Sequence, residues 1–442
     1  MRAPSTREAG FPPGLMSAAG LVSAILVMGV PGQALGDEGQ FLLGDWGGLR
    51  TSLSDQGVNF DFEYVGETAH NFSGGTAELT RYADQWTAGA TLNLERLWDW
   101  QGAQFEVVLT DRSGRNLIAD ANIGGNQLVQ EVYGGGETFR LTLAALNQTF
   151  LDGRIDWLLG RLPGGQDFAN FSCVFQNLAF CGSQPGNIVG AAWINAPISV
   201  WGTRLKLSMT NDTYAQVGGY QVTPQYEDTP FARADGLTLD NPGTIGWLLP
   251  LEFGWTPQVD GRPGAYKIGA WYDTAGGADL YYDVDYDPRA LTGAPALRRN
   301  GRYGGYINLE QQVTGEAGAK GVVIFLNATQ ADRYTSHIDR QISLGMELKQ
   351  PFGRSLDFIG LGIGATDANS RQADYQRLFN AQHPTNQGLV LDGYEYDSEV
   401  FYSWSPRRSI SIRPNFQYVV HPGGTTQNSN AAVVGLKVRV MF

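Results

Sequence analysis

One extended segment combines side chains that can bind a polar solute. Trp271, Lys267 and Asp273 are separated by even numbers of residues, so all three lie on one face of a strand. An indole ring can stack on the flat face of a ring-shaped solute, and an ammonium group and a carboxylate can replace hydrogen bonds to water. A register error of one residue would turn Trp271 to the opposite face of the sheet, and both interpretations stay open here.

Other charged residues are candidates for the same task. Arg161 and Asp167 lie in the segment that leads to a pair of cysteines. They can face a binding site, or they can form an ion pair that fastens this segment to the rest of the fold. Arg112, beside Asp111 near the end of another extended segment, is a candidate of the same kind.

Catalytic and metal chemistry have little support in the sequence. Cys173 and Cys181 form an even pair, which in an exported chain predicts one disulfide closing a short loop, with two free thiols as the alternative. No histidine or further cysteine lies near them, so we expect no metal site. The four histidines are outside any Gly-x-Ser-x-Gly motif, and we expect neither an enzyme nor a bound cofactor.

The first 36 residues have the layout of a secretory signal peptide. Two arginines precede an apolar run at 15–30, and small residues at 34–36 provide a cleavage site before Asp37. The run is shorter than the ~20 apolar residues of a spanning helix, which is the alternative. The formal net charge of −13 argues against nucleic acid as a partner.

The C-terminal segment, residues 431–442, alternates with a period of two. Val438, Val440 and Phe442 share one face, whereas Lys437 and Arg439 share the other. In a soluble sandwich the apolar face would cover a core, and in a membrane barrel it would contact lipid. A terminal aromatic residue on such a strand resembles the closing strand of bacterial outer-membrane proteins.

The same alternation recurs along the chain between clusters of Gly, Asp, Asn and Pro. Sixteen segments are predicted as strands: 59–64, 85–95, 104–111, 137–147, 155–161, 198–210, 213–222, 243–255, 265–273, 302–314, 320–330, 338–350, 356–366, 393–404, 408–420 and 431–442. An even number of strands of about this length is what a large membrane barrel needs. Charged residues on the opposite faces would then line its lumen, among them Glu95, Lys206, Glu310 and Glu347.

Aromatic residues near strand ends favour the membrane barrel over a soluble fold. The outward set is Trp86, Phe139, Tyr266, Tyr272, Tyr402, Trp404 and Tyr418, which suits the girdles at membrane interfaces. The sequence therefore predicts an all-β protein, with a transmembrane antiparallel β-barrel of about sixteen strands over residues 58–442. Before it, residues 37–57 are predicted as a short periplasmic helical segment, because Trp46, Leu49 and Leu53 share a helical face.

Short motifs along nearly the whole exported chain resemble the carbohydrate-selective porins of the OprB family. They are 43–50 (LGDWGGLR), 157–163 (WLLGRLP), 176–182 (QNLAFCG), 250–255 (PLEFGW), 263–273 (PGAYKIGAWYD), 301–306 (GRYGGY), 414–418 (PNFQY) and 421–424 (HPGG). Each is weak alone, and their number and order make the resemblance specific.

The resemblance implies an outer-membrane channel through which monosaccharides diffuse into the periplasm. Trp271, Arg161, Asp167, Arg112, Lys267 and Asp273 then become candidate sugar contacts, and outer-membrane lipid and a homotrimer become expected partners. A general porin without sugar preference fits the alternation equally well. An outer-membrane enzyme is a further alternative, which the missing motifs argue against.

Overall fold

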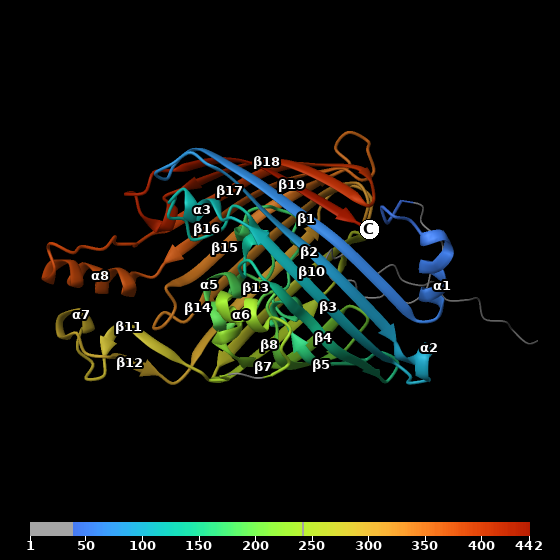
Figure 1. The fold of residues 1–442 in the computed structure, drawn as a ribbon, viewed down its shortest axis with the longest axis horizontal. Helices are drawn as coiled ribbons and strands as arrows, with labels where there is room; N and C mark the ends of the chain where they lie inside the picture. Colours follow the sequence, from blue (N-terminus) through green and yellow to red (C-terminus); the bar gives the residue numbers. More distant parts are fainter. Residues whose placement is uncertain (1–38, 241–242) are drawn as a thin grey trace, which may run out of the picture.

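Sixteen long strands form one closed barrel in the computed structural model, which describes residues 39–240 and 243–442. The strands are β1 (Val58–Ser73), β2 (Thr80–Asn93), β3 (Ala103–Gly114), β4 (Phe139–Phe150), β5 (Ile155–Leu162), β6 (Val200–Ser208), β7 (Thr213–Val222), β8 (Gly246–Trp255), β10 (Arg262–Asp273), β13 (Arg302–Gln312), β14 (Gly321–Ala331), β15 (Ile338–Lys349), β16 (Phe358–Ala368), β17 (Tyr394–Arg407), β18 (Ile410–Val420) and β19 (Ala431–Met441). Each pairs antiparallel with the next, and β1 also pairs with β19, which closes the ring (Figure 1). The predicted fold and strand number are confirmed. The predicted signal peptide lies outside the described residues.

The two faces of each strand differ as the alternation predicts. On β8, Leu249, Leu251 and Phe253 are 44–55% exposed, whereas Leu248 and Glu252 on the other face of the strand are buried. The exposed apolar row faces away from the barrel axis, where a bilayer would cover it. No helix among the described residues is long and apolar enough to cross a membrane.

A short helical segment lies at the end of the barrel that also holds the C-terminus (Figure 1). It consists of η1 (Trp46–Gly48) and α1 (Leu49–Asp55), as predicted, and Gly57 follows it with φ of +93°. At the same end, α2 (Leu94–Trp98) follows β2. The prediction that Glu95 belongs to a strand and faces the lumen is wrong: Asn93 caps α2, so β2 ends before Glu95, which is exposed.

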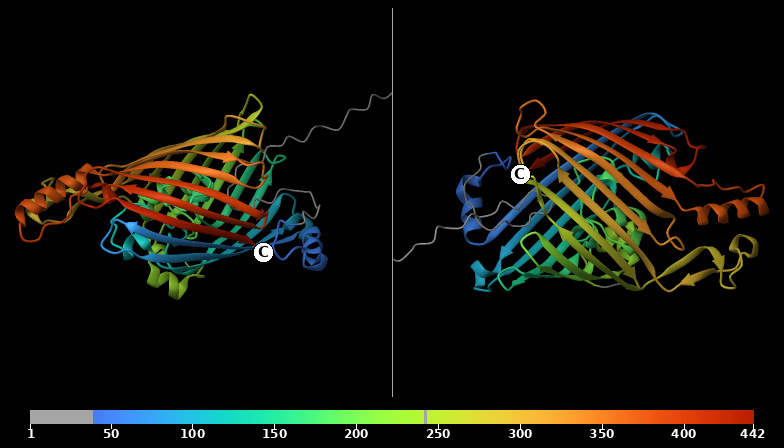
Figure 2. Two further views of the ribbon diagram at one scale, coloured as in Figure 1. Left: turned by 90° about the horizontal axis from the view of Figure 1, so that it is seen from above. Right: turned by 180° about the vertical axis from the view of Figure 1, so that it is seen from behind.

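The opposite end carries an arm that the sequence did not predict. We define the distal arm as residues 277–299 and 370–382, which comprise β11 (Gly277–Asp283), α7 (Arg289–Thr292), β12 (Ala296–Arg299) and α8 (Ser370–Gln382). Both views of Figure 2 show the arm projecting beyond the strands. Since bacterial barrels have short periplasmic turns and long extracellular loops, this is the extracellular end. In the turn between β8 and β10, the two-residue β9 (Gln258–Val259) pairs antiparallel with Arg262 and Pro263.

Two long loops fold into the barrel. The first inward loop, residues 115–138, holds α3 (Leu117–Asp120) and η2 (Glu131–Tyr133). The second inward loop, residues 163–199, holds α4 (Gly164–Asp167), η3 (Leu178–Phe180), α5 (Gln184–Ile188) and η4 (Gly190–Ala192). A third connection, between β7 and β8, carries η5 (Pro224–Glu227) and α6 (Thr229–Asp235), and η6 (Pro422–Gly424) follows β18. The interior is therefore occupied by chain, and an apolar core lies inside the barrel as well.

Candidate functional site

The second inward loop reaches strands on different sides of the lumen. The Ala169 amide donates to Glu252 on β8 at 2.9 Å, and Gln184 donates to Ser343 on β15 at 2.8 Å. The Asn177 amide donates to Glu399 on β17 at 2.7 Å. A loop bonded to β8, β15 and β17 must cross the interior, so it narrows the channel.

The two inward loops are joined to each other by backbone hydrogen bonds. The Glu131 amide donates to the Gln176 carbonyl at 2.9 Å, and the Leu178 amide donates to the Leu128 carbonyl at 2.8 Å. The loops therefore form one unit rather than two independent flaps.

Carboxylates on β17 hold both loops by their backbones. Glu395 accepts from the Asn126 and Gln127 amides of the first loop at 2.6 and 3.0 Å. Glu399, four residues along the same face, accepts from the Gln176 and Asn177 amides of the second loop. Both carboxylates are 2% exposed or less, so they are committed to this support and are not offered to a solute.

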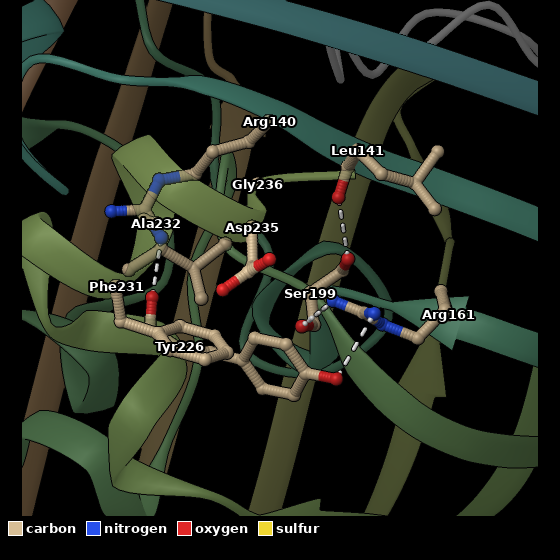
Figure 3. Close-up of a pocket in the computed structure, with 10 residues that line it drawn as sticks. Arg140, Leu141, Arg161, Ser199, Tyr226, Phe231, Ala232, Asp235 and Gly236 are labelled. Carbon is tan, nitrogen blue, oxygen red and sulfur yellow. Dashed lines mark hydrogen bonds between the residues drawn. The ribbon is translucent and has the colours of Figure 1, made fainter. Parts of the chain in front are cut away.

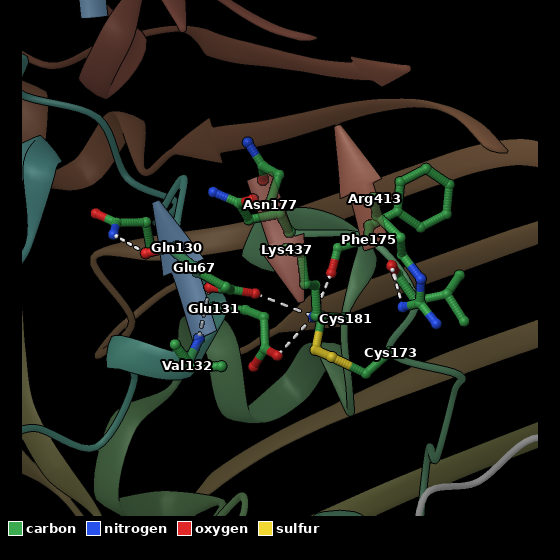
Figure 4. A network of polar contacts seen from close by, with 12 residues as sticks. Glu67, Gln130, Glu131, Val132, Cys173, Phe175, Asn177, Cys181, Arg413 and Lys437 are labelled. Atoms are coloured by element: carbon green, nitrogen blue, oxygen red, sulfur yellow. Dashed lines mark hydrogen bonds and ion pairs between the residues drawn. A yellow bond between two sulfur atoms is a disulfide. The ribbon is translucent and has the colours of Figure 1, made fainter. Parts of the chain in front are cut away.

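Lys437 on β19 binds at the junction of the two loops. Its ammonium group donates to Glu131 Oε1 and to the Phe175 carbonyl, both at 2.8 Å, and forms an ion pair with Glu67 on β1 at 3.0 Å. Figure 4 shows these groups beside the Cys173–Cys181 disulfide, which is present as predicted. Arg439, two residues further along β19, pairs with Glu63 instead.

Arg161 lies in a packed corner of the barrel rather than in an open lumen. Its guanidinium donates to the Thr238 carbonyl at 2.6 Å and to the Ser199 carbonyl at 2.7 Å, and it stacks on Tyr226. The cavity that Arg161 lines with Arg140 measures about 10 Å³, room for one water molecule at most (Figure 3). The Arg161 contacts tie the second loop and the β7–β8 connection to β5, and Arg140 ties the same connection to β4 by donating to the Tyr226 carbonyl.

Asp167 is also bonded within the fold. It accepts from the Tyr220 hydroxyl at 3.0 Å and lies 3.5 Å from Arg204 Nε on β6. Arg204 forms a second ion pair, with Asp156, at 3.0 Å. The geometry is that of an ion pair fastening the start of the second loop to the wall.

Trp271 points into the barrel, but the second inward loop covers it. Its ring lies 5.4 Å from the ring of Trp193 in that loop and it is 4% exposed. On the same strand, Lys267 donates to the Asn170 carbonyl at 2.6 Å. Asp273 is fully buried and pairs with Arg302 at 2.6 Å. The three residues share the inward face, and their contacts hold the loop and neighbouring strands.

Arg112 keeps part of its hydrogen-bonding capacity. Its Nε donates to Gln85 at 2.7 Å and its Nη1 donates to the Gly134 carbonyl of the first inward loop. No hydrogen bond of Nη2 is found among the described residues. Asp111, by contrast, pairs opposite the exposed Trp86 and therefore lies on the outward face.

Several lumen-facing charges have no partner within the described residues. Glu106 on β3 has neither a hydrogen bond nor an ion pair, and Asp61 on β1 is within its electrostatic reach. On β6, which is separated from β3 only by β4 and β5, Lys206 stacks on Tyr214 at 4.1 Å. Our selection of site candidates missed Glu106, although the alternation of 104–112 identifies it as inward. Uncommitted groups of both signs are what a passing polar solute can exchange hydrogen bonds with.

Known proteins share this architecture. The family model described as carbohydrate-selective porin, OprB family, matches residues 77–442. Porin B of Pseudomonas aeruginosa is 39% identical over 428 residues, which cover 93% of each chain. A putative porin, QuiX, of Acinetobacter baylyi is 31% identical over 447 residues, covering 96% of this chain and 98% of the relative.

A solved structure agrees over the whole barrel. The structure of Pseudomonas putida OprB at high pH superimposes with a TM-score of 0.88 at 39% identity, covering 92% of this chain and 99% of the other. These relatives are channels, not enzymes, and their barrels place the chain in the bacterial outer membrane. The chain belongs to the OprB family of carbohydrate-selective porins.

Proposed function

We propose that this channel prefers monosaccharides of the glucose type and lets them diffuse passively into the periplasm. The observation that carries the proposal is the joined pair of inward loops, which is bonded to strands on several sides of the barrel and narrows its lumen. A narrow passage lined by polar groups can replace the water around a small sugar while excluding larger solutes. Weak binding is required, because the solute must leave again.

Within this proposal the candidate residues divide into two groups. Of the six candidates, Arg112 keeps Nη2 uncommitted among the described residues, although the residue is 8% exposed. The half-buried Glu106 and Lys206 join it as candidate sugar contacts. The remaining candidates position the loops or the wall through the bonds described above: Arg161, Asp167, Lys267, Trp271 and Asp273.

Solute swelling of liposomes that contain the purified, unreduced protein tests the proposal. The panel compares glucose and other monosaccharides with uncharged solutes of equal size, with amino acids and with disaccharides. We expect monosaccharides to enter faster than size-matched solutes that are not sugars. Entry governed by size alone would leave a general porin, and no entry at all would overturn the proposal.

Two further expectations, about oligomeric state and about removal of the signal peptide, are also proposals. A homotrimer in outer-membrane lipid is expected, and native mass spectrometry in lipid nanodiscs would detect it or show a monomer. Processing after residue 36 is checked by sequencing the N-terminus of the protein isolated from outer membranes.

A further inference from the structure

We propose that Lys437 sets the width of the constriction, as a positioning residue that fastens the joined inward loops to the closing strands of the barrel. This inference rests on the proposed function, since it concerns the same constriction. It differs from sugar contact, because Lys437 is 3% exposed and acts on the solute only through the loops.

The contacts of the Lys437 ammonium group connect three separate parts of the chain. Glu67 belongs to β1, Glu131 to the first inward loop and Phe175 to the second. Both loop contacts lie at the backbone bond that joins the loops: the Glu131 amide donates to the carbonyl of Gln176, the residue after Phe175. One side chain thus contacts both loops at their joint and connects them to the β1–β19 seam (Figure 4).

The carboxylates around the Lys437 side chain require a cation at this position. Glu67 is fully buried, and its second oxygen accepts from the Val132 amide of the first loop at 3.2 Å. Arg112 lies within electrostatic reach of Glu67 and Glu131, and Arg413 and Glu399 lie within reach of Lys437, so three cations and three carboxylates meet at this site. Removing the Lys437 charge would take away the cation that is paired with both Glu67 and Glu131 in this buried site, and Glu131 is the partner that lies on a loop rather than on a strand.

The disulfide supports the same joint from the other side. The carboxylate of Glu131 and the sulfur atoms of Cys173 and Cys181 lie within 4.8 Å of one another. Phe175 lies inside the short loop that the disulfide closes. If Lys437 is replaced, Glu131 cannot shift toward residues 173–181, because the disulfide restrains that segment. We therefore expect the first inward loop to move away from the β1–β19 seam.

The chain supplies a matched control two residues away. Arg439 is on the same face of β19 and pairs with Glu63 on β1, but it contacts neither inward loop among the described residues. Substitution of Arg439 removes a β1–β19 ion pair from the same seam while leaving the loops attached. Any effect that Lys437 exerts through barrel closure alone must therefore appear in Arg439 variants too.

The experiment compares wild type, Lys437→Met, Glu131→Ala and Arg439→Met in liposome swelling and single-channel recording. Unboiled electrophoresis in detergent first establishes that each barrel is closed. We expect Lys437→Met and Glu131→Ala to raise the ratio of disaccharide to monosaccharide entry by about twofold or more and to increase conductance, because the aperture is wider. Arg439→Met keeps the wild-type ratio.

Glu131→Ala keeps the inference falsifiable if Lys437→Met does not fold, because it leaves the Lys437–Glu67 pair in the seam. Unchanged entry ratios and conductance in the folded variants would overturn the inference, as would an equal change in Arg439→Met. Failure of the proposed function looks different: the wild type would show no preference for monosaccharides over size-matched solutes, whatever the variants do to the size limit.

Discussion

Single carboxylates have opposite roles according to what surrounds them. Glu252 accepts four hydrogen bonds, from the Ala169 amide, the Tyr214 and Tyr306 hydroxyls and the Gln216 amide group, all at 2.8–2.9 Å. It is a structural support, and its loss would leave buried donors unpaired. Glu106 has no such partners, and its charge is available to ions and solutes in the lumen.

The unpaired carboxylate of Glu106 predicts a measurable effect on ion selectivity. We expect Glu106→Gln to lower the permeability ratio of K⁺ to Cl⁻ by about twofold, because a fixed negative charge in a narrow pore concentrates cations. The reversal potential across a planar bilayer in a KCl gradient at about pH 9, where the carboxyl group is ionised, measures this ratio. Glu95→Gln is the control, since Glu95 is exposed on α2 outside the lumen. An unchanged reversal potential in Glu106→Gln would place this charge away from the ion path.

The inward or outward direction of a residue could be predicted from the sequence, but most contacts between the strands and the inward loops could not. Alternation correctly placed Lys437 inside the barrel, because a strand has a strict period of two, and the structure selects the inward one of the two interpretations left open for Trp271. Whether an inward residue meets the lumen or a loop depends on how residues 163–199 fold across it. That path is set by bonds to residues more than 200 positions away, such as Glu399, and no local pattern reveals them.

At the scale of elements, the Cys173–Cys181 bridge restrains the loop segment that carries Phe175. A sequence separation of 8 gives an expected stabilisation of about 2.5 kcal/mol from the unfolded state alone. We expect reduction to lower the denaturant midpoint and to speed the entry of disaccharides in liposome swelling. Cys173→Ser/Cys181→Ser should show the same change and no further response to reductant. Transport that is unaltered by reduction would contradict a role for the bridge in the constriction.

The distal arm depends on one buried carboxylate. Asp279 accepts from the Tyr281 and Tyr282 amides at 2.8 and 2.9 Å, and from Arg299 on β12 and Arg371 on α8 at 2.8 Å. Burial raises the pKa of Asp279, but these hydrogen bonds outweigh burial and bring the pKa below its ordinary value of 3.8. The hairpin and α8 are therefore joined through a charged group.

This lowered pKa predicts an arm that loosens in acid. A carboxyl group with a lower pKa in the folded state stabilises that state at pH values above 3.8, and the contribution is lost as the pH falls through the folded-state pKa. We expect hydrogen exchange, corrected for intrinsic rates, to accelerate in residues 277–283 and 370–382 between pH 5 and about pH 3. Asp279→Asn should exchange fast already at pH 7, whereas Asp374→Asn, at an exposed ion pair, should not. Equal exchange at both pH values would refute the role of Asp279.

The elements that the sequence revealed are those with a membrane face. All sixteen barrel strands were found because lipid on one side and polar groups on the other impose alternation. The distal arm was missed because it has no such contrast: α8 contains few apolar residues and buries only Ala373, so no apolar stripe marks it as a helix. The hairpin β11–β12 pairs over only a few residues, with an irregular register.

At the scale of the whole molecule, the barrel closes where the ends of the described chain meet. Strands β1 and β19 pair from Glu63 and Met441 onwards, and closure removes the free edges of the sheet. The N-terminal segment reinforces this seam from outside the lumen: the Leu42 amide donates to the Met441 carbonyl at 2.7 Å. The segment that carries the N-terminal helix is therefore bonded to the strand that closes the barrel.

Arg50 on α1 is the residue that connects this helix to both closing strands. Its Nη1 donates to the Phe60 carbonyl at 2.8 Å and its Nη2 donates to the Phe442 carbonyl at 2.7 Å, while the guanidinium stacks on Phe41 and Trp46. Two charge-assisted hydrogen bonds and two partly exposed stacking contacts are together worth on the order of 2–4 kcal/mol. These contacts stabilise the β1–β19 junction, where the barrel would open first if that strand pairing were lost.

We therefore expect Arg50→Ala to lower the temperature at which the folded band converts to the unfolded band in detergent electrophoresis. Arg50→Lys should give an intermediate temperature, because one ammonium group can keep the charge but cannot span both carbonyls as a planar fork does. Arg96→Ala is the control: Arg96 also reaches from one helix to a backbone carbonyl, that of Ser54, but it contacts neither β1 nor β19. Monosaccharide entry through the closed Arg50→Ala barrel should stay at the wild-type rate. Arg50 binds β1 at Phe60, whereas the first inward loop attaches to β1 further along the strand, at Glu67. A conversion temperature equal to that of wild type would show that strand pairing alone closes the barrel.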